Sequence, residues 1–151
     1  MNYNEIIFKE LELIREDLIK SYDAKGMRAS GNFANSLEVK LKDKGAELWG
    51  PNYSEQLEKG RDAGKFPPIN AIEQWIKDKN IQFEKITISS LAFLIARKIS
   101  REGWDRRDFG GVELISEVIT PERMQTIIDK VGQIELTGFI SEIKKQINEL
   151  V

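Results

Sequence analysis

The sequence contains no cysteine and no histidine among its 151 residues. Without cysteine the chain has no disulfide, no thiolate nucleophile and no thiolate metal site. Without histidine it lacks the side chain that most often serves as a general base near neutral pH and as a metal ligand. Catalysis would have to use carboxylate-bound magnesium, a lysine nucleophile or a pair of carboxylates. The two absences therefore make catalysis less expected without eliminating it.

The chain also lacks an excess of one charge and a long hydrophobic run. It has 23 Lys and Arg against 25 Asp and Glu, a formal net charge of −2, so the whole molecule has no basic field to gather nucleic acid or an anionic membrane. No apolar run approaches the roughly 20 residues of a transmembrane helix, and residues 1–5 do not have the basic flank of a signal peptide. We expect a cytosolic product without membrane contact.

The composition is that of a well-solvated globular domain, with 40% hydrophobic and 32% charged residues. The sequence shows no internal repeat, no low-complexity tract and no linker. A chain of this length can bury one core without disulfides. We therefore predict that residues 1–151 form a single α+β domain, in which an N-terminal helix and a β-hairpin pack against several α-helices.

The first half of this domain has clear periodic patterns. Residues 4–22 predict an amphipathic helix whose apolar stripe consists of Ile7, Leu11, Ile14, Leu18 and Tyr22. Gly26 is suited to a left-handed cap after it, and residues 31–32 predict a loop. Residues 36–42 then alternate, with Leu37, Val39 and Leu41 on one face, which predicts a strand. A three-residue turn at 43–45, with Gly45 at positive φ, would return the chain as a second strand over 46–49.

The second half predicts helices with one short strand. Short or regular helices are expected at 53–59, from Pro68 to about 79, and at 87–102, where Gly103 ends the helix. In the last of these, Leu91, Leu94, Ile95 and Ile99 form the stripe, while Ala92 and Ala96 permit close approach of a neighbour. Residues 112–119 predict a strand near the hairpin. Thr120 is a good N-cap for a helix at 121–131, which would pause at Gly132 before a last helix at 137–150.

One candidate for chemistry is Glu38-Val39-Lys40 on the first predicted strand. Restriction-type nucleases carry Glu-x-Lys on a strand, together with a preceding acidic residue that shares a magnesium ion. Here that acid would have to be Asp17 or Asp23, and both fall in or at the end of the first helix. Any half-buried strand with a polar face also produces this triplet. The solvated-face interpretation is favoured, and a magnesium-dependent nuclease remains the enzymatic alternative.

A second candidate is a group of basic residues around Trp104, formed by Arg97, Lys98, Arg101, Arg106 and Arg107. Such a group can bind nucleic acid through phosphate contacts and base stacking. Glu102, Asp105 and Asp108 interleave with it, which indicates local ion pairs. Trp and Arg are also favoured at protein interfaces. Subunit contact or a plain surface is favoured, and a small nucleic-acid-binding regulator remains the alternative.

After the predicted helix and hairpin, several segments follow in a distinctive order. They are Tyr53-Ser54-Glu55-Gln56-Leu57-Glu58-Lys59-Gly60, then Pro67-Pro68-Ile69 with Ala71-Ile72 and Trp75-Ile76, and finally Ala92-Phe93-Leu94-Ile95-Ala96-Arg97-Lys98-Ile99 up to Gly103. This order resembles the head–tail joining, or tail-completion, proteins of tailed bacteriophages, and the resemblance covers residues 4–108. Each single feature also has a structural explanation as core, cap or turn. The chain departs from the family after Gly103, where residues 104–111 replace a short Arg-Pro-Phe-like segment, and residues 109–151 form a C-terminal extension.

The resemblance implies a virion component at the neck or upper tail, made in the host cytoplasm, that catalyses nothing and binds no cofactor or metal. Such proteins form rings around the channel through which DNA leaves the head, so the expected partners are copies of this chain and neighbouring neck, tail or portal-side proteins, with DNA only as cargo. We expect the contact surfaces to be the hairpin tip, the loop at 60–67 and the segment 104–109. The residues assigned to them, together with Tyr53, are Lys44, Gly60, Arg61, Lys65, Phe66, Pro67, Trp104, Arg106, Arg107 and Phe109.

Overall fold

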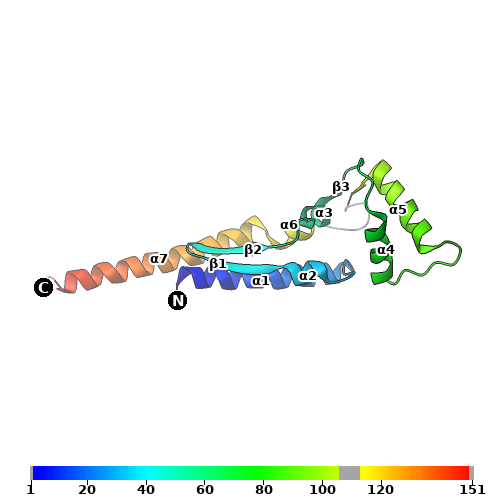
Figure 1. Cartoon of the computed structure of the whole chain (residues 1–151). Coiled ribbons are helices and arrows are strands. Elements are labelled where there is room, and N and C mark those ends of the chain that lie inside the picture. The colour runs from blue at the N-terminus through cyan, green and yellow to red at the C-terminus, as the bar shows by residue number, and fades with distance from the viewer. Residues whose placement is uncertain (1, 106–112, 150–151) are drawn as a thin grey trace.

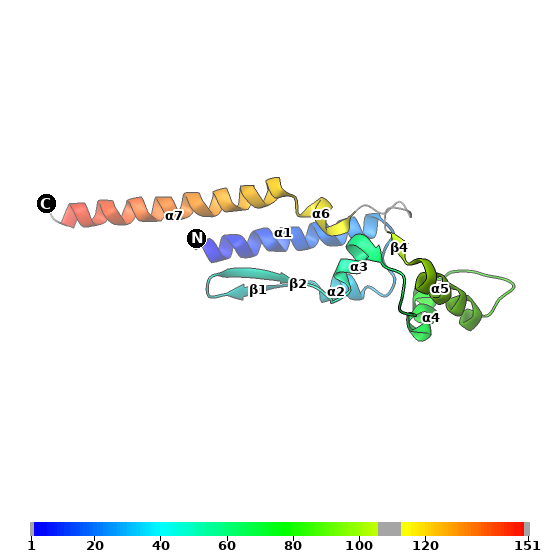
Figure 2. The same ribbon diagram turned by 90° about the horizontal axis from the view of Figure 1, so that it is seen from above.

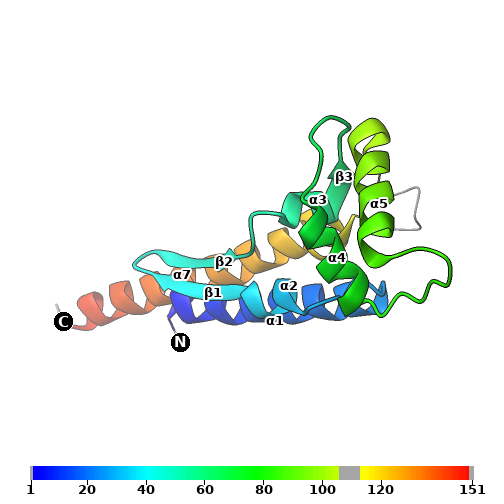
Figure 3. The same ribbon diagram turned by 45° about the vertical axis from the view of Figure 1, so that its right-hand side comes forward.

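A computed structural model gives the architecture of the chain and describes residues 2–105 and 113–149. The fold mixes helices with a small antiparallel sheet, as the sequence predicts. Its elements are α1 (Tyr3–Ala24), α2 (Asn32–Ser36), β1 (Glu38–Lys42), β2 (Gly45–Trp49), α3 (Ser54–Lys59), β3 (Gly60–Arg61), α4 (Ile69–Asp78), α5 (Ile88–Glu102), β4 (Trp104–Asp105), α6 (Leu114–Val118) and α7 (Pro121–Glu149). The molecule is elongated: α1, the β1–β2 hairpin and α7 run lengthwise, and the α4–α5 pair stands at one end (Figures 1 and 3).

Helix α1 forms the axis of the elongated part. The side chain of Asn2 caps its start by accepting a hydrogen bond from the Asn4 amide at 2.8 Å. Its end has the predicted left-handed glycine, since Gly26 has a φ of 64°. Viewed from above, α1 lies between the hairpin and α7 (Figure 2), and it contacts both. It therefore buries side chains on two sides.

The β1–β2 hairpin is confirmed, with one correction to its turn. Lys42 pairs with Gly45, so the loop has two residues instead of the predicted three, although Gly45 does adopt a positive φ of 117°. Leu41 is exposed, contrary to the expectation that it shares the buried face. The side chain of Asn4 donates to the carbonyl of Asp43 at 3.2 Å. The tip thus reaches the first turn of α1, where little of that helix remains to cover Leu41.

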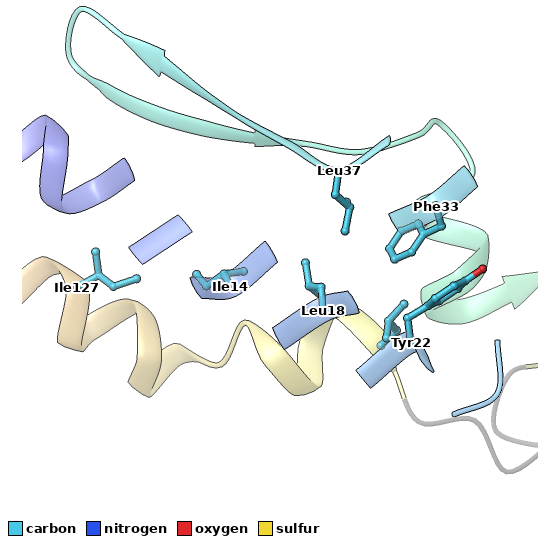
Figure 4. Packing of buried hydrophobic residues seen from close by; sticks show 7 residues of the cluster. Ile14, Leu18, Tyr22, Phe33, Leu37 and Ile127 are labelled. Carbon is cyan, nitrogen blue, oxygen red and sulfur yellow. The ribbon is translucent and has the colours of Figure 1, made fainter. Parts of the chain in front are cut away.

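The main core forms where α1 meets α2, α6 and α7 (Figure 4). The predicted residues Ile14, Leu18 and Tyr22 supply the α1 side of this core. Phe33 comes from α2, a short helix that the sequence analysis missed because five residues show no periodicity. The rings of Tyr22 and Phe33 are 4.7 Å apart, a distance typical of aromatic pairs. Leu37, Leu114 and Ile127 complete the cluster, so the core joins distant parts of the sequence.

Helices α4 and α5 pack against each other beside this core. Ala92 and Ala96 are completely buried and Ile76 is nearly so, which confirms that the alanines permit close approach. Leu94 is exposed, so its predicted place in the buried stripe is wrong. The alanine face takes the position next to α4, which turns Leu94 toward solvent. Thr87 caps α5 by accepting from the Ser90 amide at 3.2 Å.

The predicted strand at 112–119 is instead helix α6, over Leu114–Val118, and it packs against α1 and α3. Its branched apolar side chains had indicated a strand. The buried carboxylate of Glu58 on α3 accepts hydrogen bonds from the amides of Ile115 and Ser116. This tertiary contact satisfies donors at the start of the helix. Val112 itself lies outside the described residues.

Helix α7 is continuous through Gly132, so the predicted break between two C-terminal helices is wrong. An interior helical glycine costs only about 1 kcal/mol relative to alanine, and no neighbouring atom crowds Gly132. The predicted N-cap is confirmed by a 3.2 Å hydrogen bond from the Arg123 amide to the Thr120 hydroxyl. Among the described residues, no helix has both the length and the apolarity needed to span a membrane.

Candidate contact surfaces

Two of the predicted contact segments meet in the structure. Strand β3 pairs antiparallel with β4, so that Gly60 lies opposite Asp105 and Arg61 lies opposite Trp104. The guanidinium of Arg61 also donates to the carbonyl of Lys65 at 3.2 Å. Residues that the sequence analysis assigned to separate surfaces therefore form one surface at the junction between the α4–α5 pair and the rest of the molecule.

Gly103 makes this pairing possible. It has a φ of 63°, and a Cβ atom there would overlap the carbonyl oxygen of Arg61 and lie 2.7 Å from the Ala63 amide nitrogen. The amide of Gly64 donates to the carbonyl of Ser100 at 2.9 Å, and the hydroxyl of Ser100 donates back to the Gly64 carbonyl at 3.1 Å. The loop at 60–67 is thus held against the end of α5 by two hydrogen bonds between Gly64 and Ser100.

A polar groove of about 460 Å³ runs along this junction. Lys59 and Arg61 contribute cations to its lining, while Glu102 and Asp105 contribute carboxylates. The half-buried indole of Trp104 also lines it. Of these lining residues, Trp104 and Arg61 are of the types enriched at protein interfaces, whereas Lys, Glu and Asp are depleted there.

The remaining residues of the loop separate into exposed and buried ones. Lys65 is exposed, and Phe66 is exposed but packs against Phe93 of α5 with ring centroids 5.7 Å apart. Pro67 is buried, so it supports the loop from within and offers no surface in the isolated chain. Phe93, exposed like Phe66, enlarges this aromatic surface, and the sequence analysis did not assign it to a contact.

The other predicted contact residues lie elsewhere or outside the described chain. Lys44 is exposed at the hairpin tip, and Tyr53, 40% exposed, precedes α3, where desolvation of its phenol raises its pKa. Arg106, Arg107 and Phe109 lie outside the residues that the structure describes. The described contact candidates therefore lie at the β3–β4 junction, on the adjoining loop beside α5, at the start of α3 and, separately, at the hairpin tip.

Glu58 is the buried member of the Tyr53–Gly60 segment. Its carboxylate accepts hydrogen bonds from the Ile115 amide, from the Ser116 amide at 3.0 Å and from the Ser116 hydroxyl. Three donors satisfy a carboxylate that is only 7% exposed. The sequence analysis gave Glu58 no role, because its donors lie almost sixty residues further along the chain.

The nuclease candidate lies on the outer face of the hairpin. Glu38 and Lys40 are both exposed and form an ion pair at 3.4 Å, and the Lys40 ammonium lies 5.0 Å from the centre of the Trp49 ring. Asp17 pairs with Arg123 at 2.8 Å, and Asp23 pairs with Arg28 at 2.6 Å. Within residues 2–105 and 113–149, no group of three or more acidic side chains is arranged to hold a metal ion.

The basic candidate occupies an exposed face of α5. Arg97, Lys98 and Arg101 are all exposed and share that face with Leu94 because their spacing is helical. Within the described residues none of these three forms an ion pair with a carboxylate, while Arg106, Arg107 and Asp108 of the predicted group lie outside the described residues. This face has the charge for a phosphate contact and the apolar residue for a protein contact.

No protein-family model matches the chain, and no curated protein or solved structure is significantly similar to it.

Proposed function

We propose that the protein is a structural virion component of a tailed bacteriophage, forming part of the neck or upper-tail ring that joins head to tail. The proposal starts from the resemblance over residues 4–108. The order of elements in the fold is compatible with it: α1, the hairpin, α3, the α4 helix after two prolines, and α5 with its buried alanines.

The β3–β4 junction is the observation that carries the proposal. The segment Tyr53–Gly60 and the segment after Gly103 are far apart in the sequence, and both belong to or adjoin the resemblance. Arg61, directly after the first segment, pairs with Trp104 in the second. This pairing places an aromatic residue and residues of both charges along one groove. Trp and Arg are enriched at protein interfaces, so Trp104 and Arg61 are the residues proposed to contact a neighbouring subunit.

The elongated shape supports the same function. The hairpin tip with Lys44 and the junction with Trp104 lie toward opposite ends of the hairpin–α5 part of the molecule (Figure 1). A subunit with separated contact sites can touch two neighbours at once, as closure of a ring requires. In this proposal the protein binds no cofactor, DNA passes only as cargo, and neighbouring neck, tail or portal-side proteins dock on the remaining surfaces.

Complementation tests the proposed surfaces. In a phage whose own copy of this gene carries an early stop codon, the chain is supplied from a plasmid as wild type or with Lys44→Ala, Phe66→Ala or Trp104→Ala. We expect the variants to fold, as judged by circular dichroism, and to lower the yield of infectious particles. Lys20→Ala, at an exposed position on α1, is the matched control and leaves the yield unchanged. If all three variants restore normal yields, these surfaces are not the contacts.

A further inference from the structure

The α4–α5 pair forms a part of the molecule with a small core of its own. We call residues 62–102 the arm, and residues 2–59 and 113–149 the body. Among the described residues, all members of the main core and all partly buried side chains packed against it belong to the body. Ile76, Ala92 and Ala96 are buried separately, in the α4–α5 pair. The arm therefore contributes nothing to the main core.

The arm is held together as one rigid unit. Its loop is bonded to α5 in both directions, since the Gly64 amide donates to the Ser100 carbonyl and the Ser100 hydroxyl donates to the Gly64 carbonyl. Its two helices are joined by the Ser89 hydroxyl, which donates to the carboxylate of Glu73 at 2.7 Å. Any displacement of the loop or of α4 therefore carries α5 with it.

The two-residue strands β3 and β4 form a ribbon that carries the arm. Gly60 lies opposite Asp105 at the body end of the ribbon, and Arg61 lies opposite Trp104 at the arm end. Gly60 has a φ of 98° and a ψ of −152°, a region that glycine adopts far more readily than other residues. Hinges consist of a few residues at the ends of elements that absorb changes in φ and ψ. Gly60 directly follows α3, which Glu58 fixes to α6, so it marks the boundary between a fixed helix and the ribbon.

Apart from the ribbon, one hydrogen bond joins the arm to the body within the described residues. The ammonium of Lys79, at the end of α4, donates to the carbonyl of Gly26, just after α1. The end of α4 lies near this end of α1 in two views (Figures 1 and 3). Gly26 is exposed, so water can replace the lysine on its carbonyl oxygen. The contact can therefore open without leaving a buried polar group unpaired.

We propose that the arm swings as a rigid unit about Gly60, and that the hydrogen bond from Lys79 to Gly26 is a latch that holds it in the described position. Parts of a chain that share no large apolar interface are expected to move relative to one another. The groove at the junction is lined by Lys59 of the body and by Asp62 and Glu102 of the arm. The swing therefore changes the width of the groove. It depends on the packing of this chain alone, so it stands whether or not the protein is a virion component.

Distances between spin labels on paired cysteines measure the swing, and the absence of native cysteine makes both label positions unambiguous. Lys20→Cys on α1 with Lys98→Cys on α5 spans the body and the arm, and both positions are exposed. Lys20→Cys with Gln133→Cys on α7 lies within the body and is the control pair. With the latch removed by Lys79→Met, the body–arm distance distribution should be about twofold wider than that of the control pair. Equal widths would overturn the swing.

The latch is tested by comparison with the chain that keeps Lys79. That chain should give a narrower body–arm distribution than the Lys79→Met variant, at equal helicity by circular dichroism. Lys77→Met, at an exposed position of the same helix, is the matched control and should leave the distribution unchanged. If Lys79→Met has no effect on the width, or if both substitutions widen it equally, Lys79 is not the latch.

Discussion

A buried carboxylate destabilises a fold unless hydrogen-bond donors surround it, and Glu58 is the clearest case in this molecule. Its three donors come from Ile115 and Ser116, so one side chain fixes α3 to the start of α6. This contact explains why a segment rich in β-branched residues becomes helical. It also gives the Glu of the Tyr53–Gly60 segment a structural role that does not depend on any partner.

Replacing Glu58 by glutamine should therefore destabilise the fold. Glutamine keeps the shape of the side chain but replaces one acceptor oxygen with an amide donor that faces the donors of α6. Hydrogen bonds to a charged group contribute about 1.5–3 kcal/mol to the free energy of unfolding. We expect the free energy of unfolding in urea to fall by about that amount. Glu55→Gln, on the exposed side of the same helix, is the control and should change it by less than about 0.5 kcal/mol. Equal stability of the two variants would contradict this role.

Two glycines should respond to alanine in opposite directions. Gly103→Ala introduces a Cβ against the backbone of Arg61 at a positive φ, and a strained position of this type costs about 1–3 kcal/mol. Gly132→Ala lies in open space inside a helix and should stabilise by about 0.5–1 kcal/mol. Thermal unfolding of both variants checks the prediction. A rise in melting temperature for Gly103→Ala would show that β3 and β4 do not approach as described.

At the scale of elements, the sequence predicted those parts of the fold whose patterns are local. The stripe of α1, the alternation around Val39 and the glycine caps all act between near neighbours, so they could be identified without tertiary information. Helix α6 depends on Glu58, and the β3–β4 pair depends on Gly103, so neither could be identified locally. The candidate surfaces follow the same division: exposed Lys44 was predictable, whereas the meeting of Arg61 with Trp104 was not.

Two ion pairs near the C-terminal end of α1 should make stability depend on pH. The hydrogen bond from Lys25 lowers the pKa of Glu117 below its ordinary 4.5, and the hydrogen bond from Arg28 lowers the pKa of Asp23 below its ordinary 3.8. A carboxyl group with a lower pKa in the folded state than in the unfolded state stabilises the fold at pH values above its unfolded-state pKa. This contribution is lost as the pH falls through the folded-state pKa.

The free energy of unfolding should therefore decline as pH falls below about 4.5. The variant with both Lys25→Met and Arg28→Met should show a shallower decline in that window, because neither carboxyl keeps its lowered pKa. Urea unfolding at a series of pH values measures the slope. An unchanged slope in the double variant would show that these pairs do not contribute.

The hairpin provides an element-scale test of the enzymatic alternative. Glu38 pairs with Lys40 on an exposed face, which indicates a solvated surface. We expect no nicking of supercoiled plasmid by the purified protein with magnesium, and no difference between wild type and Glu38→Ala. Magnesium-dependent nicking that Glu38→Ala abolishes would replace the structural proposal with a nuclease.

At the scale of the whole molecule, the chain combines a long helical axis with contact surfaces that lie apart from one another. The junction at Trp104 and the hairpin tip at Lys44 belong to the proposed ring contacts. The C-terminal part of α7 carries a separate exposed apolar stripe that includes Leu136, Phe139 and Ile147. Exposed Phe66 and Phe93 on the loop side of α5 are apolar surface that another chain can cover, which is a physical basis of the assembly proposal.

The most direct test is electron microscopy of lysates from a phage in which an early stop codon interrupts this gene. The account predicts filled heads lying apart from tails, and restoration of joined particles when the chain is supplied from a plasmid. Normal infectious particles in the absence of the chain would contradict it. That result would remove the protein from the essential virion and leave the nuclease and nucleic-acid-binding alternatives.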